Sequence, residues 1–312
     1  MSEEAPRRAG SRPGVAVLTG AGHIVLGPGG SEEEADPIPY LRDRKSRKYM
    51  GLQDEMAVVA AGRALHRAGL EAPLGEDVGL FLAVGLIPFR YADIQRVVEA
   101  SLVDDHFSLE RFASEGYARA RPLIAFRCLP NMPAHHVSAN FDLQGPYLVA
   151  YPGAGQLYQA LDAAMDAIGS GRIEIALVGG VAHHHNFLVR HHFARLLPPV
   201  PAERLRDAAA FLVLEGAEAA SRRGAPILAR LEAKELRYER FDPRVALPAG
   251  AESLRLGASD IPTIRTLYEG LELGPASLPA ALSEALETPG FTLDHALHAR
   301  DGVVASSRWT AP

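Results

Sequence analysis

The stretch GPYLVAYPGAGQLYQALDAAMDAIGSGRIEIALVGG, residues 145 to 180, decides the fold. Its pattern predicts a strand over residues 147 to 151, a tight glycine turn, a buried helix and a second buried strand. In the turn, Gly153 and Gly155 flank Ala154. Some enzymes present a nucleophilic side chain on such a strand-to-helix turn, whereas alanine has no nucleophilic atom.

The composition is that of a globular protein, with 312 residues, of which 47% are hydrophobic and 22% are charged. A net charge of −6 argues against nucleic acid as a main partner. Cys128 is the single cysteine, which excludes an internal disulfide and fits a reducing compartment. The sequence has neither an apolar run of membrane-spanning length nor a signal peptide, so we expect a cytoplasmic protein with no membrane contact.

Strands and helices alternate outside this stretch. Residues 15 to 19 form a short apolar run that predicts a buried strand closed by a tight loop at Gly20 and Gly22. Residues 78 to 84 form a continuous apolar run, typical of a strand covered on both faces. The alternation predicts a mainly parallel α/β sheet. Near the C-terminus, Asp301-Gly302 predicts the turn of a terminal hairpin.

Several motifs together resemble the β-ketoacyl synthase branch of the thiolase-fold enzymes. In the order of the family they are LTGAG (18 to 22), NMPAHHVSANFDLQGP (131 to 146), an elbow turn at Ala154 eight residues after Gly-Pro, a strand ending in Gly179-Gly180, and LVLEGAEAASRRGAPILARLE (212 to 232). The resemblance covers roughly residues 14 to 235. It implies an α/β, thiolase-like layered fold whose N-terminal half is fairly complete and whose C-terminal half is truncated.

The resemblance also divides the chain. It implies a flexible N-terminal tail (1 to 13), a ketosynthase-like core (14 to 235) and a shortened C-terminal part (236 to 312) that packs on the same core. Only 132 residues follow Gly180, too few for the family's complete second half. We therefore expect residues 236 to 312 to complete the sheet with fewer strands than the first half supplies, leaving one face open or covered by a partner.

The chemistry of the family is missing from these motifs. Its nucleophilic cysteine falls on Ala154, whose methyl group cannot be acylated. Its two catalytic histidine motifs, of the His-Gly-Thr-Gly-Thr and Gly-His types, do not occur, and the surroundings of His295 and His298 do not match them. The resemblance therefore implies an elbow, or oxyanion-type turn, at Gly153, Ala154 and Gly155, with no catalytic residue and no cofactor. It describes a chain that is not an enzyme on its own.

Pairing is the second implication of the resemblance. Ketosynthases of this type form dimers through the strand before the elbow, which here is Tyr147, Leu148, Val149, Ala150 and Tyr151. In type II polyketide systems an inactive chain-length factor occupies half of such a dimer and shapes the acyl tunnel. Those relatives commonly carry glutamine at the cysteine position, whereas this chain has alanine.

The resemblance thus implies a non-catalytic, chain-length-factor-like subunit of fatty-acid or polyketide biosynthesis. Its partners would be an active ketosynthase, in a heterodimer or heterotetramer, and an acyl carrier protein. Two alternatives remain open. One is an enzyme that works without a thiol, such as a malonyl- or acyl-carrier decarboxylase or an acyltransferase. The other is a self-paired structural homodimer.

Two further groups of residues are candidates for binding. The candidates for lining an acyl pocket are Asn131, Met132, His183, His184 and Phe193. Five histidines are clustered here: His183, His184, His185, His191 and His192. No cysteine or acidic residue lies within this cluster, so we expect no metal site. The candidates for docking an acidic carrier protein are Arg42, Arg44, Lys45, Arg47 and Lys48. A solvated surface segment is the alternative for this basic run.

Overall fold

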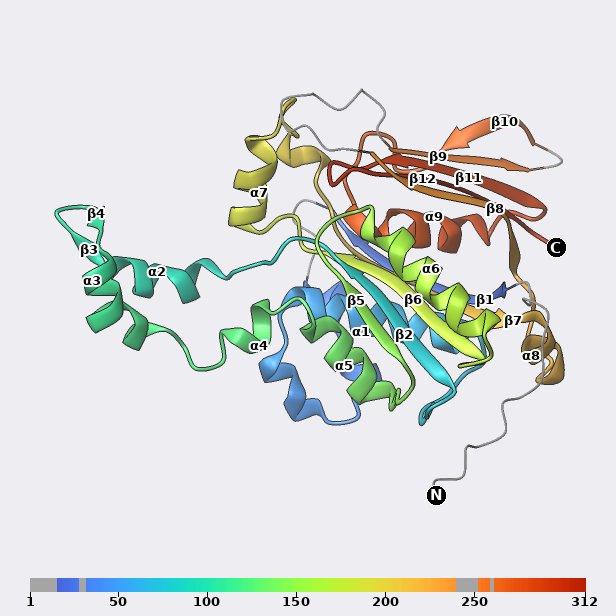
Figure 1. Cartoon of the computed structure of the whole chain (residues 1–312), viewed down its shortest axis with the longest axis horizontal. Coiled ribbons are helices and arrows are strands. Elements are labelled where there is room, and N and C mark those ends of the chain that lie inside the picture. Colours follow the sequence, from blue (N-terminus) through green and yellow to red (C-terminus); the bar gives the residue numbers. More distant parts are fainter. Residues whose placement is uncertain (1–15, 28–31, 240–251, 259–260) are drawn as a thin grey trace, which may run out of the picture.

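The computed structural model describes residues 16 to 27, 32 to 239, 252 to 258 and 261 to 312. The expected N-terminal tail lies outside the described residues. Ten strands form one hydrogen-bonded sheet, which Figure 1 shows divided into two layers. Each layer contains five neighbouring strands of the sheet.

The first layer has strands of both directions. In sheet order they are β5 (Tyr147–Ala150), β2 (Val78–Val84), β6 (Ile175–Ala182), β7 (Asp207–Gly216) and β1 (Ala16–Leu26). β2 runs parallel to β5 and β6, whereas β7 runs antiparallel to β6 and β1. The expectation of a mainly parallel sheet is therefore wrong. The chain turns back at the end where β6 finishes, instead of crossing over a face of the sheet, so that β7 runs in the opposite direction.

The second layer is antiparallel throughout. Its strands, in sheet order, are β8 (Ala229–Tyr238), β12 (Val303–Thr310), β11 (Phe291–His298), β9 (Glu252–Ala258) and β10 (Ile261–Thr266). β8 joins the two layers by pairing with Val17 and Leu18 of β1. The terminal hairpin predicted at Asp301-Gly302 is confirmed.

The expectation of fewer strands from residues 236 to 312 is met only in part. In the part of the chain that the structure describes, this segment supplies four whole strands, against five in the first layer, but β8, which begins at Ala229, brings the second layer to five. Antiparallel strands need only short hairpin connections, so five of them fit into a short segment. Within the described residues, no helix covers the outward face of β8, β11 and β12 (Figure 1). Along β12, buried residues alternate with residues that are half-buried or exposed, which is the pattern of a sheet with one solvated side. Among the described residues, the second layer thus has five strands but no helix on its outward face.

The main helices pack on both faces of the first layer of strands. α6 (Gln156–Gly169) and α9 (Ser277–Ala285) lie between the two layers of strands, where they share one apolar core with both (Figure 1). α1 (Leu52–Arg67) and α5 (Met132–Phe141) cover the other face of the first layer, over a second core. The elbow helix predicted from the sequence is therefore a central, enclosed element.

β1 corrects one expectation about its glycines. The strand continues through Gly20 and Gly22 instead of ending in a loop there. A Cβ atom on Gly22 would lie 2.5 Å from the backbone nitrogen of Ala64 in α1, and one on Gly20 would collide with the carbonyl oxygen of the same residue. These glycines allow α1 to pack directly on the strand, which is a different use of glycine from a turn.

The remaining elements are peripheral. A lobe between β2 and α5 extends from the body (Figure 1); it consists of α2 (Tyr91–Glu99), β3 (Leu102–Val103), β4 (His106–Phe107), α3 (Leu109–Arg111), a π-helical turn (Phe112–Gly116), a 3₁₀ turn (Tyr117–Arg119) and α4 (Ala125–Cys128). α7 (Phe187–Ala194) and α8 (Ala217–Arg222) flank β7 in the chain. Short 3₁₀ helices span Glu32–Ala35, Ile38–Tyr40, Arg44–Tyr49, Ala202–Arg204 and Gly274–Ala276. Within the described ranges, no helix has the length and apolar character that crossing a bilayer requires.

Candidate functional site

The elbow lies between the end of β5 and the start of α6. Gly153 has a φ of 107°, in the left-handed region that favours glycine, and lets the chain reverse before the helix begins at Gln156. Ala154 is half-buried, and its methyl group packs against the central core. The structure therefore has the strand-turn-helix arrangement predicted from the sequence, with a methyl group where a nucleophile would stand.

The turn of the β11–β12 hairpin contacts this elbow. The Gln156 side-chain amide Nε2 donates a hydrogen bond of 2.8 Å to Asp301 Oδ2. The backbone N–H of Val303 donates to the other oxygen, Asp301 Oδ1, over 3.2 Å. Sequence analysis identified this turn but not its position over the elbow, because nothing local relates residue 301 to residue 156.

A buried polar network ties the first turn of α6 to the second layer of strands. The Tyr158 hydroxyl lies 2.8 Å from His295 Nδ1 and 2.9 Å from Ser307 Oγ. His295 Nε2 lies 3.0 Å from Glu252 Oε1, and Trp309 Nε1 donates to Ser307 Oγ over 3.2 Å. Tyr158 is fully buried, and burial raises the pKa of its hydroxyl. Apart from the half-buried Glu252, the side chains of this network are buried, and they tie the elbow helix to the second layer.

His183, His184 and His185 lie in the segment between β6 and α7. The His184 ring contacts the Phe193 ring edge-on at 4.9 Å, and its Nδ1 lies 3.0 Å from the carbonyl oxygen of Glu272. Burial lowers the pKa of His184 to about 4, so that the imidazole is neutral at pH 7. Burial, reinforced by the charge of Glu252, raises the pKa of the Glu272 carboxyl to about 7.

His183 and His185 meet a single carboxylate. Asp207 Oδ2 lies 3.1 Å from His185 Nδ1 and 3.9 Å from His183 Nε2. No group of three or more His, Cys, Asp or Glu side chains within the described parts of the chain is arranged to hold a metal ion. The remaining pocket candidates, Asn131 and Met132, begin α5, which packs on the face of the first layer opposite α6. Of the predicted lining, the rings of His184 and Phe193 are in direct contact, whereas Asn131 and Met132 lie at the start of α5.

The strand proposed for pairing is an edge of the sheet, because among the described strands β5 has only β2 as a neighbour. Tyr147 is 74% exposed and Leu148 and Val149 are half-buried, whereas Ala150 is buried. Tyr151 lies just beyond the strand and is exposed. In the basic run, Arg42, Arg44, Lys45 and Lys48 are exposed, whereas Arg47 forms ion pairs with Asp36 and Glu55.

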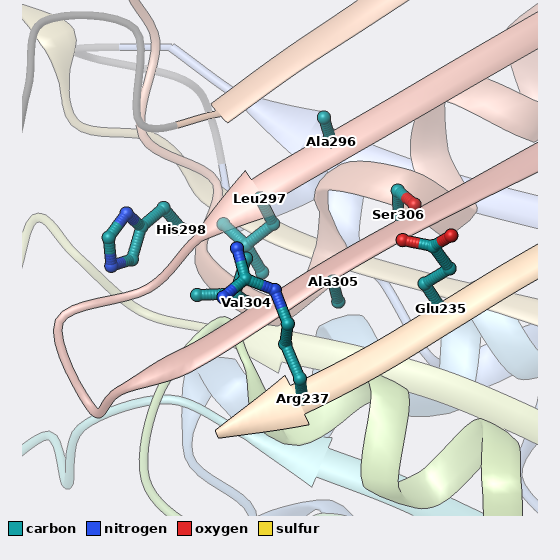
Figure 2. A pocket seen from close by; sticks show the side chains of 8 residues that line it. All are labelled: Glu235, Arg237, Ala296, Leu297, His298, Val304, Ala305 and Ser306. Atoms are coloured by element: carbon teal, nitrogen blue, oxygen red, sulfur yellow. The ribbon is translucent and has the colours of Figure 1, made fainter. Parts of the chain in front are cut away.

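A shallow groove of about 270 Å³ crosses the outward face of the second layer (Figure 2). Small side chains form part of its lining, among them Ala296 and Ser306, and Arg237 and His298 lie at one end. Both of these basic residues pair with Glu239, at 3.5 Å between His298 Nε2 and the carboxylate. The two basic side chains at this end of the groove are therefore already paired with a carboxylate of the same chain.

The β-ketoacyl synthase N-terminal domain family model matches residues 18 to 211. Among curated proteins, Nodulation protein E of Rhizobium meliloti (strain 1021) is 27% identical over 242 residues, which are 74% of this chain and 57% of that protein. Nodulation protein E of Rhizobium leguminosarum bv. trifolii is 28% identical over 210 residues, which are 64% of this chain and 50% of that protein. This chain thus spans little more than half the length of the curated relatives it matches.

Many solved structures share the fold, among them the following two. One is a chain in the structure of a type II polyketide acyl-carrier protein in complex with its ketosynthase bound to the hexaketide; the TM-score is 0.66 at 17% identity, over 96% of this chain and 100% of the other. The other is the ishigamide ketosynthase/chain length factor, with a TM-score of 0.54 at 23% identity, over 73% of this chain and 64% of the other. The thiolase-like ketosynthase fold expected from the sequence is confirmed.

Proposed function

This chain belongs to the β-ketoacyl synthase family, and we propose that it is a non-catalytic subunit that pairs with an active ketosynthase in fatty-acid or polyketide biosynthesis. The observation that carries the proposal is the elbow at Ala154, which keeps its turn, its helix and its enclosed position but has no nucleophilic atom. Claisen condensation on a ketosynthase needs a thiolate to carry the acyl chain. A chain of this kind acts through the partner whose acyl pocket it helps to shape.

The open edge of β5 supports pairing. The N–H of Leu80 in β2 donates to the carbonyl oxygen of Pro146, and Leu80 stands opposite Tyr147 in the parallel register. In a parallel ladder this places the N–H and C=O groups of Tyr147 and Val149 on the side away from β2. An edge strand with unpaired backbone groups is a template for a strand of another chain.

The lobe between β2 and α5 supports the same proposal. Within residues 86 to 131, no aliphatic or aromatic side chain whose burial is described is buried. Leu109 and Tyr117 are 76% and 71% exposed, and Tyr91 contacts Phe187 of α7 at the surface. Apolar residues without a core of their own mark a surface that a partner covers.

The complex with an acyl carrier protein is part of the proposal. It rests on the exposed cations Arg42, Arg44, Lys45 and Lys48, which suit an acidic carrier. The similarity to a ketosynthase structure that contains a carrier protein agrees with it. Self-pairing through β5 is a second candidate, because an open edge also suits a second copy of this chain.

A proline at Tyr147 tests the pairing. Tyr147→Pro removes one outward N–H donor and leaves the β2–β5 ladder intact, because the ladder uses the groups of Pro146 and Leu148. Tyr147→Thr is the matched control, since it removes the exposed ring and keeps the donor. Leu148→Asp and Ala150→Asp are less suitable, because Leu148 packs on the central core and Ala150 is buried.

The assay is co-expression with the intact ketosynthase encoded nearest to this chain, followed by size-exclusion chromatography with light scattering. We expect a mixed complex for the wild type and Tyr147→Thr, and at least a tenfold weaker one for Tyr147→Pro. A homodimer that excludes the ketosynthase and dissociates in Tyr147→Pro would establish self-pairing. A stable monomer that is unaffected by either substitution and carries out condensation alone would contradict the proposal.

A further inference from the structure

A carboxylate of the same chain lies against the elbow. Asp301 stands at the tip of the β11–β12 hairpin and is itself exposed. One of its oxygens accepts from the Gln156 side chain and the other from the backbone of Val303. The carboxylate is therefore fixed on both oxygens, by one group of the elbow helix and one of the hairpin.

The fit between this turn and the elbow is close. A Cβ atom on Gly155 would lie 2.8 Å from Asp301 Oδ1 and 2.5 Å from the Cβ of Val303. A Cβ atom on Gly153 would lie 3.5 Å from Asp301 Oδ2. The two carboxylate oxygens thus face the two glycines that flank Ala154, and only glycine at position 155 leaves room for the hairpin.

The buried network fixes the hairpin in this position. His295 in β11 and Ser307 in β12 both contact the Tyr158 hydroxyl, which lies one helical turn beyond Ala154. The hairpin is held to α6 by its strands as well as by its tip. It is a packed part of the central core and not a loop free to open.

We propose that Asp301 closes the elbow of this chain: its carboxylate covers the turn at Ala154 and excludes an acyl group or an external anion from it. The inference rests on the proposed non-catalytic role, since a chain that used this turn would need it open. It goes further by stating that the loss of the nucleophile is accompanied by physical closure of the site. Acyl chains in the complex would then enter only the partner's elbow.

The test introduces a thiol as a probe. Cys128→Ala is used as the background, so that Ala154→Cys provides the only thiol of the chain. Its alkylation by neutral iodoacetamide and by anionic iodoacetate is followed by intact mass from pH 6 to pH 10. The same measurements are made after adding Asp301→Asn, which keeps the shape and removes the charge. Ala296→Cys, on the exposed outward face of β11, is the matched control with and without Asp301→Asn.

With Asp301 present, we expect the introduced thiol to react at least tenfold more slowly than the thiol at position 296. Asp301→Asn is expected to lower its pKa by about one unit and to raise the rate with iodoacetate more than the rate with iodoacetamide, because a like charge disfavours both thiolate and anion. The control should not respond. Gln156→Ala removes the hydrogen bond from the elbow helix to the carboxylate and leaves the bond from the Val303 N–H within the hairpin, so it decides the question if Asp301→Asn does not fold.

Equal reactivity at positions 154 and 296, with no response to Asp301→Asn or Gln156→Ala, would overturn the inference. These measurements do not depend on pairing. A shielded thiol in a chain that binds no ketosynthase would leave the closure standing and end the proposed subunit role. An unshielded thiol in a chain that does bind a ketosynthase would end the closure and leave the proposed subunit role standing.

Discussion

Replacing Tyr158 by phenylalanine removes one buried oxygen atom and leaves the aromatic ring in the core. That oxygen lies within hydrogen-bond distance of His295 Nδ1 and Ser307 Oγ, at 2.8 and 2.9 Å. The ring is fully buried between the two layers of strands. The substitution therefore tests whether polar contacts of the network, and not only apolar packing, hold the elbow helix to the second half.

The structure sets the size of the effect. Each lost hydrogen bond is worth about 1 kcal/mol net, and a buried group left without a partner costs more. His295 retains Glu252, and Ser307 retains the indole N–H of Trp309, so neither loses all its partners. We expect the free energy of unfolding to fall by about 2 kcal/mol, within a range of about 1 to 3 kcal/mol.

The assay is urea unfolding at pH 7, followed by circular dichroism, on the chain alone. Tyr117→Phe is the control, because Tyr117 is 71% exposed, and its effect should stay within about 0.5 kcal/mol. The slope of the unfolding free energy against urea concentration (the m-value) should not change, because unfolding exposes the same surface in both variants. If Tyr158→Phe leaves the denaturation midpoint where the control leaves it, the network contributes nothing and the apolar core alone holds α6.

Three other results are expected. Acyl-carrier thioesters and cysteine-directed ketosynthase inhibitors should leave no adduct in the elbow, because Ala154 has no thiol; an acyl group found there by peptide mass spectrometry would contradict the assignment. His184 is neutral in the fold, so the chain should lose stability as the pH falls from 6.5, the ordinary pKa of histidine, towards about 4, the pKa of His184 in the fold. His184→Asn should therefore show a smaller difference in unfolding free energy between pH 7 and pH 5 than the wild type. An unchanged difference would exclude His184 as a source of the pH dependence. Gly180→Ala should cost about 3 kcal/mol in urea unfolding, because its Cβ would collide with the backbone of Pro275, whereas Gly257→Ala, in open space, should cost far less.

The elements that the sequence predicted well are those with a local pattern. The strand, turn and helix around Ala154 follow one another without a gap, and periodicity alone defines them. The continuous apolar run of β2 likewise belongs to a strand covered on both faces. Gly20 was interpreted wrongly because glycine serves both turns and close contacts, and only the position of α1 distinguishes these uses.

The contacts that close the site depend on distant parts of the chain. Tyr158 and His295 are separated by 137 positions, and Gln156 and Asp301 by 145. Neither pair has a sequence signature, because each side chain alone resembles an ordinary surface or core residue. The direction of β7 was missed for the same reason, since it depends on where the chain re-enters the sheet.

Glycines of the elbow and of β6 explain why the family's pattern persists in this chain without a nucleophile. A side chain at Gly155 would meet Val303 of the terminal hairpin, one at Gly180 would meet Pro275 before α9, and one at Gly179 would meet the ring of Phe211. Two of these three contacts join the first layer to the second half of the chain. Because native cores are close-packed, a side chain at any of these three positions would disrupt the packing there, whether or not the site is chemically active. Ala154, by contrast, needs only to be small. The fold therefore does not need a thiol at position 154, whereas it does need the glycines, and packing alone is sufficient reason for this chain to keep the family's pattern of glycines.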